Sequence, residues 1–164
     1  TDVKIAEQII NEVSREVQSQ GWHFNTEDRV PLAPDNNNEI NIPATAARID
    51  LEDTNVTVRG GKLYNLTDRT YTFDATAYAV IVYYQDFLEL PDPAKRYITV
   101  RASRIYSDRM INSETMHKLL SRDEQKALTD LKEFEGDTGD FNMMDSYSVS
   151  RVMNRNNSNQ RILM

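Results

Sequence analysis

The chain has 164 residues, of which 39% are hydrophobic and 27% are charged, and this composition is typical of a single water-soluble domain. No apolar run approaches the ~20 residues that cross a bilayer, so no membrane insertion is expected. The absence of cysteine from the sequence excludes disulfides, thiolate metal sites and cysteine nucleophiles. The formal net charge of −7 argues against a protein that gathers nucleic acid over its whole surface, because such binding requires clustered positive charge.

Residues 3–20 are predicted to form an amphipathic helix that ends at Gly21. Trp22 and Phe24 follow directly, and aromatic residues beside a helix end often anchor the chain where it changes direction. Both are therefore expected to pack at the junction between this helix and the β-rich part that comes next. The apolar side chains that recur at helical spacing are Ile5, Ala6, Ile9, Ile10, Val13 and Val17.

Residues 22–90 are predicted to form short antiparallel strands and turns. Alternating stretches such as NEINI, ARIDL and NVTVRGGKLYNL are separated by prolines and by an asparagine-rich segment. Gly60 and Gly61 can adopt the positive φ of a two-residue hairpin turn, so RGGK is interpreted as a turn and not as a phosphate-binding loop. The continuous apolar run from Tyr78 to Tyr84 is typical of a strand covered on both faces.

A second helix is predicted to begin after Leu90. Asp92 would be its N-cap, Pro93 would take the first helical position, and the helix would run to about Arg109. Its apolar stripe would face the core and leave a basic side exposed. The basic residues assigned to that side are Lys95, Arg96, Arg101, Arg104 and Arg109.

A third helix is predicted over about residues 114–134. Ser121 and Glu124 form a capping-box pattern inside it, which would permit a break there. Residues 136–164 are rich in glycine, asparagine and serine, and they are expected to form an extended, partly disordered C-terminal arm.

The predicted fold class is therefore α+β. A helical, bundle-like part would comprise residues 1–21 and 93–135, and a central part of short antiparallel strands would comprise residues 22–90. Both parts are expected to belong to one domain within residues 1–150.

Charge alternates in sign along the chain. Residues 93–122 contain seven basic and two acidic residues, whereas residues 123–145 contain two basic and eight acidic residues. The basic helix could therefore pair with acidic residues such as Asp130 and Glu133 of another copy, and such a head-to-tail contact closes into a ring if the rotation is right. The alternative interpretation is a solvated helix face, and the reversal of sign favours the contact between copies.

Asp86, Glu89 and Asp92 could supply the paired carboxylates of a glycoside hydrolase. With 26 acidic residues in the chain, such clusters also arise as helix caps and solvated loop charge, so the hydrolase stays an alternative. His23 and His117 are far apart in the sequence, and the DNNNE stretch has Ile40 where a calcium loop needs glycine, so neither a metal nor a cofactor is expected.

Five stretches together resemble a known family in their order and spacing. They are GWHFNTE, LAPD, RGGKLYN, ELPDPAKRYITVRASRIYSDR and DFNMMD, and they fall within about residues 3–150. In this order they resemble the tail tubular protein A family, the gatekeeper or adaptor of short-tailed phages. The resemblance implies a structural protein of the virion tail, made in the cytoplasm of the host bacterium, with a helical part and a β-rich part.

Members of that family form a dodecameric ring that encloses the channel through which DNA leaves. The resemblance therefore implies that residues 1–150 are an adaptor domain whose partners are its own copies, the portal protein and the nozzle, tail tubular protein B. Tail fibres are a further candidate partner, and DNA would pass transiently. It also implies a helical segment upstream of Thr1. The alternative function is a tail-associated glycoside hydrolase that acts on host envelope saccharides.

Overall fold

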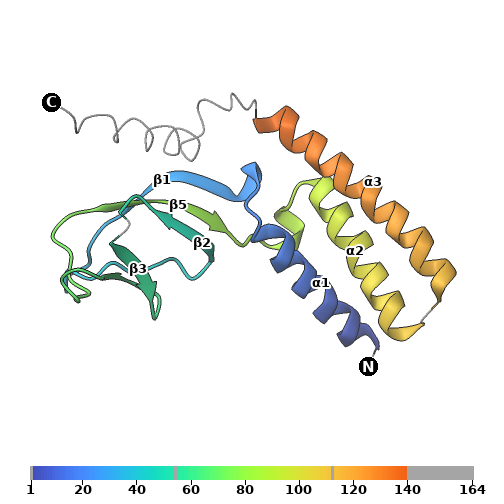
Figure 1. Ribbon diagram of the computed structural model, residues 1–164, viewed down its shortest axis with the longest axis horizontal. Helices are drawn as coiled ribbons and strands as arrows, with labels where there is room; N and C mark the ends of the chain where they lie inside the picture. The colour runs from blue at the N-terminus through green and yellow to red at the C-terminus, as the bar shows by residue number, and fades with distance from the viewer. Residues whose placement is uncertain (1, 54, 112, 140–164) are drawn as a thin grey trace, which may run out of the picture.

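The computed structural model describes residues 2–53, 55–111 and 113–139. Three α-helices lie side by side at one end of the molecule, and the strands lie at the other end (Figure 1). The strands form a three-stranded sheet and a two-stranded hairpin. The predicted α+β class is confirmed.

The helical part consists of α1 (Asp2–Gln18), α2 (Asp92–Met110) and α3 (Glu114–Gly139). The middle helix, α2, packs against both of the others (Figure 1). Gly21, just beyond α1, has a φ of 81°, which is the left-handed conformation that commonly ends a helix. Apolar residues at i, i+3 and i+4 spacing build the core of this part, which contains Ile9, Val13, Val17, Trp22, Leu90, Ala94, Tyr97, Ile98, Ala102, Ala127 and Leu131.

The N-cap predicted for α2 is wrong. Pro91 is the N-cap of α2, so Asp92 and Pro93 both lie in its first turn, and the Asp92 carboxylate pairs with Lys95 at 3.5 Å. The third helix passes through Ser121 and Glu124 without the break that the capping-box pattern would permit, and the Glu124 side chain is buried. The helix also continues past residue 134 to Gly139. The rest of the predicted arm, residues 140–164, lies outside the described residues.

The three-stranded sheet has the order β1 (Thr26–Leu32), β5 (Ala77–Tyr83), β2 (Ala46–Leu51), and both pairings are antiparallel. The central strand, β5, corresponds to the apolar run predicted from Tyr78 to Tyr84. Its neighbouring residues Ile81 and Val82 are both buried although they point to opposite faces, so the sheet is covered on both faces there. The cover does not extend along the whole strand, because Tyr78 is exposed.

The edge strand β1 is irregular. Its register with β5 shifts between Glu27 and Val30, and within this shift Arg29 has a φ of 52°. Pro31 lies two positions further along the same strand. This combination is typical of a β-bulge on an edge strand.

The predicted hairpin is formed by β3 (Val56–Arg59) and β4 (Lys62–Asn65). Gly60 and Gly61 connect the two strands with φ values of 57° and 75°. The NEINI stretch is not a regular strand, since Glu39 and Asn41 form only isolated bridges, but Ile40 between them is fully buried. The second apolar core lies between the sheet and the hairpin, and it contains Leu32, Ile40, Leu63, Ala79 and Ile81.

Replacement of Gly61 by alanine is expected to lower the free energy of unfolding by about 1 kcal/mol. A Cβ atom at Gly61 would meet nothing within 4 Å, so the cost comes from the left-handed backbone alone. Urea melts would measure the change, and Gly60→Asn is a suitable comparison because asparagine tolerates this conformation better. An unchanged midpoint for Gly61→Ala would show that the turn relaxes to another conformation.

Candidate functional site

Two buried amide side chains, those of Gln18 and Asn25, join the helical part to the β-rich part. The Gln18 Nε2 group donates to the Gln85 carbonyl at 3.1 Å, and the Gln18 Oε1 atom accepts from the Gln85 N–H at 2.7 Å. Asn25, in the short 3₁₀ helix η1 (His23–Asn25), donates to the carbonyls of Gln18 at 2.9 Å and Tyr83 at 2.8 Å. These bonds hold the end of α1 and the end of β5 in one orientation.

Trp22 and Phe24 lie at this same joint. The Trp22 side chain is only 8% exposed, and its Nε1–H donates to the Val17 carbonyl at 2.7 Å. The Phe24 ring is nearly parallel to the indole, with 6.4 Å between the ring centroids, and it packs against the core of the helical part. The two aromatic residues therefore extend the helical core up to the first strand.

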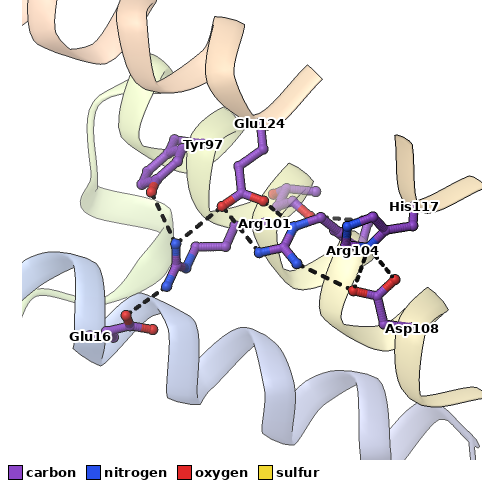
Figure 2. A network of polar contacts seen from close by, with 9 residues as sticks. Glu16, Tyr97, Arg101, Arg104, Asp108, His117 and Glu124 are labelled. Atoms are coloured by element: carbon purple, nitrogen blue, oxygen red, sulfur yellow. Dashed lines mark hydrogen bonds and ion pairs between the residues drawn. The ribbon is translucent and has the colours of Figure 1, made fainter. Parts of the chain in front are cut away.

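An ion-pair network connects the three helices (Figure 2). At its centre, the Glu124 carboxylate of α3 is buried and accepts from Arg101 Nη1 at 3.1 Å and from Arg104 Nε. The other terminal nitrogen of Arg101, Nη2, donates to Glu16 of α1 at 2.7 Å. A single buried carboxylate of α3 is thereby linked through α2 to α1.

The network continues along α2 toward the end of the helical part that lies away from the strands. Arg104 Nη1 donates to Asp108 at 3.2 Å, and the other side of that carboxylate is 2.9 Å from Nδ1 of His117 on α3 (Figure 2). The hydrogen bond to Glu124 is the main cause that raises the pKa of the Arg104 guanidinium. Burial lowers the pKa of Arg101, but its neighbours Tyr97, Glu16 and Glu124 more than offset this, so the pKa of Arg101 is also raised. Both guanidiniums stay charged across the physiological pH range.

The prediction that all five basic residues of α2 are exposed is wrong for Lys95, Arg101 and Arg104, which are only partly exposed. The side chains of Arg101 and Arg104 are 25% and 22% exposed, because both turn toward Glu124 and serve contacts within the chain. Both were predicted on the solvent side of the helix because their buried partner, Glu124, lies on another helix. Their charges are therefore already matched inside the monomer.

The other three basic residues of α2 make more open contacts. Arg96 pairs at 3.3 Å with Asp130 of the same chain, and Arg109 lies 3.9 Å from Glu12. Lys95 pairs with Asp92 in the first turn of the helix. The predicted partner Asp130 is thus engaged within its own chain, whereas Glu133 is exposed. Surface pairs of this kind contribute little, about 0–1 kcal/mol each.

An apolar groove of about 320 Å³ opens at the end of the helical part that lies away from the strands. Its walls come from all three helices, and its lining is mostly apolar. The lining residues are Ala6, Ile10, Ala102, Ser103, Tyr106, Ser107, Ile111, Met116 and Leu120. The groove was not predicted from the sequence, because the helical spacing of apolar residues such as Ala6 and Ile10 indicates only that they face the core.

The model of one protein family, described as tail tubular protein, matches residues 1–141. The chain belongs to the tail tubular protein family. It is therefore a structural component of the tail of a phage virion. No curated protein matches the chain at a significant level.

The three carboxylates considered for hydrolysis lie at the joint of this tail tubular protein. Asp86 is the N-cap of the 3₁₀ helix η2 (Phe87–Glu89), and Asp86, Glu89 and Asp92 are all exposed. None of them lines the groove. The geometry therefore gives the hydrolase alternative no specific support.

The DNNNE stretch of the tail tubular protein forms a turn around Asp35. The Asp35 carboxylate accepts from the backbone N–H groups of Asn37 and Glu39 at 2.8 and 3.0 Å, and these bonds, that of Glu39 first, lower its pKa. Within the described ranges, no group of three or more His, Asp or Glu residues is arranged to hold a metal ion. No helix in those ranges is long and apolar enough to cross a membrane.

Proposed function

We propose that copies of the chain form the adaptor, or gatekeeper, ring of a short-tailed phage. This ring would connect the portal to the tubular nozzle and line part of the channel for DNA ejection. The observation that carries this proposal is the family match over residues 1–141. A tube is built from repeated copies, so a surface for self-association is required. In the proposed virion a dodecamer would contact the portal protein and tail tubular protein B, with tail fibres as a further partner and with synthesis in the host cytoplasm.

The joint supports a role in which the two parts act as one body. A ring that transmits position from portal to nozzle needs subunits whose helical and β-rich parts do not swing freely. The Gln18 side chain bonds to the backbone of Gln85, and the Asn25 side chain bonds to the Tyr83 carbonyl. These bonds fix both segments in which the chain passes between the two parts. Each of these bonds is at least half-buried, where water competes for it weakly.

The distribution of charge supports passage of DNA. Residues 1–92 contain sixteen acidic and seven basic residues, and Asp28, Glu52 and Asp53 are among the exposed acidic ones. A wall of this sign repels phosphates, so DNA would slide along it, whereas a basic wall would retain the DNA through counterion release.

Ion pairs between neighbouring copies are expected to determine how the two copies are aligned more than how tightly they bind. Arg101 and Arg104 are engaged inside the chain, so the contact with a neighbour's acidic side chains, such as Glu133, would fall to Lys95, Arg96 and Arg109. Exposed pairs contribute little each, so most of the binding energy must come from apolar contact.

Multi-angle light scattering is expected to detect a large assembly of the 18.9 kDa chain, up to a dodecamer, with annular particles in negative-stain images. Raising the salt concentration from 0.1 M to 1 M shortens the Debye length from about 10 Å to about 3 Å and should shift the assembly partly toward smaller species. A mass that stays monomeric at all protein concentrations, both alone and with portal protein, would contradict the ring.

A further inference from the structure

The groove and the helix surfaces near it expose several large apolar side chains. The lining residues Ile111 and Met116 are 60% and 42% exposed, and Val3, Met110 and Leu119 are also exposed in the three helices. A soluble monomer rarely exposes a patch of this kind unless another surface covers it. The surface is formed by flexible methionines and by aliphatic side chains, which accommodate an apolar segment readily.

A segment with suitable chemistry follows α3 directly. Residues 140–145 have the sequence DFNMMD, in which Phe141, Met143 and Met144 are apolar and an aspartate stands at each end. Most of the lining residues belong to residues 93–122, the most basic segment of the chain. Arg109 and Lys118 of this segment are exposed; Arg109 lies 3.9 Å from Glu12, and Lys118 pairs with Glu114 at 2.7 Å in an open surface contact. Residues 146–164 are less suitable, because they contain three basic residues and no acidic ones.

The length of the chain prevents this segment from reaching the groove of its own subunit. The groove contacts α3 near its beginning, at Met116 and Leu120, and α3 then runs to Gly139. At 1.5 Å per residue, Leu120 and Gly139 are about 28 Å apart. The five residues that end at Met144 span about 18 Å when fully extended. DFNMMD can therefore bind only the groove of another copy.

We propose that the groove binds residues 140–145 of the neighbouring copy. This inference rests on the proposed ring and specifies its contact. Each subunit gives one segment and receives another, which is a head-to-tail contact that closes when the rotation matches the number of subunits. Phe141, Met143 and Met144 enter the apolar groove, and the two aspartates face the basic residues beside it.

Cysteine cross-linking tests this contact directly, because the natural chain contains no cysteine. The double variant Met116→Cys/Met143→Cys places one thiol at the groove and one in the segment. Mild oxidation of the assembled protein is expected to give a ladder of covalent oligomers on a non-reducing gel, and the ladder should collapse to monomer on reduction. The matched control is Leu88→Cys/Met143→Cys, in which the first thiol is 84% exposed but lies at the joint, and this control should give at least tenfold less cross-linked product.

A second pair of variants measures the effect on assembly. Met116→Glu places a charge at the mouth of the groove, where the native side chain is already exposed, so the fold should be retained. It is expected to raise the concentration needed for assembly at least tenfold, whereas Leu88→Glu should leave that concentration unchanged. Circular dichroism would check that both variants are folded.

Four outcomes would overturn the proposal. An assembly without cross-links, or one that Met116→Glu does not weaken, would leave the ring intact and show that something else covers the groove. A fast-migrating monomer with an internal disulfide would show that the segment folds back onto its own subunit. If the protein does not assemble under any condition, both the proposed ring and the proposed exchange of segments are wrong.

Discussion

Replacement of Trp22 by alanine is expected to lower the free energy of unfolding by about 3–5 kcal/mol. The indole is almost fully buried in the helical core, and its removal would leave a cavity within the cluster that also contains Val17 and Leu90. The Nε1–H bond to the Val17 carbonyl would be lost as well, which leaves a backbone acceptor near the end of α1 without that partner. Chemical denaturation followed by circular dichroism would measure the change.

Two further variants separate the causes. Trp22→Phe keeps an aromatic ring but removes the N–H donor, so it should cost less than the alanine variant. Leu88→Ala removes a large apolar side chain that is exposed, and it should change the stability by less than ~0.5 kcal/mol. A loss below ~1 kcal/mol for Trp22→Ala would mean that the joint can close around the missing ring.

Replacement of Glu124 by alanine is expected to cost about 2–4 kcal/mol. The variant leaves two guanidiniums, those of Arg101 and Arg104, without their shared carboxylate at a partly buried position. Breaking one partner of a fully buried pair costs about 3–5 kcal/mol, and we expect somewhat less here because both arginines keep some contact with water. The helices should separate first, since α3 loses its polar connection to α1.

Asp130→Ala is the matched control, because it removes an acidic residue of the same helix whose pair with Arg96 lies at the surface. Its cost should be about 0–1 kcal/mol, and 1 M salt should nearly abolish it. Equal costs for Glu124→Ala and Asp130→Ala in thermal melts would show that water screens the whole network. For the same reason, reversing Arg101 and Arg104 to glutamate should unfold the helical part and not merely block assembly.

Local patterns predicted the elements of the fold well. The apolar spacing from Ile5 to Val17 specifies α1, and Gly60–Gly61 between alternating strands specifies the hairpin, because each depends only on neighbours in the sequence. The ends of helices were less predictable. Asp92 suits an N-cap by its residue type, but the backbone conformation makes Pro91 the N-cap and places Asp92 in the first turn.

The polar contacts at the joint could not be predicted from local patterns. Gln18 and Gln85 are far apart in the sequence, and nothing in either neighbourhood identifies the other. Glu124 did carry a usable signal, since it stands at helical spacing between Leu120 and Ala127 on the apolar stripe of α3. A carboxylate in such a stripe indicates a buried ion pair. The basic residues at i, i+3 spacing on α2, Arg101 and Arg104, were its partners.

The irregular β1 strand has a consequence for a protein that works in many copies. Identical chains held close together risk joining their open sheet edges into an endless cross-chain sheet. β1 is such an edge strand, but Pro31 has no N–H group that could bond to an added strand. The left-handed backbone conformation at Arg29 also interrupts the row of donors and acceptors. Edge-to-edge growth is therefore blocked on this side of the sheet, so a high local concentration of subunits does not lead to aggregation through β1.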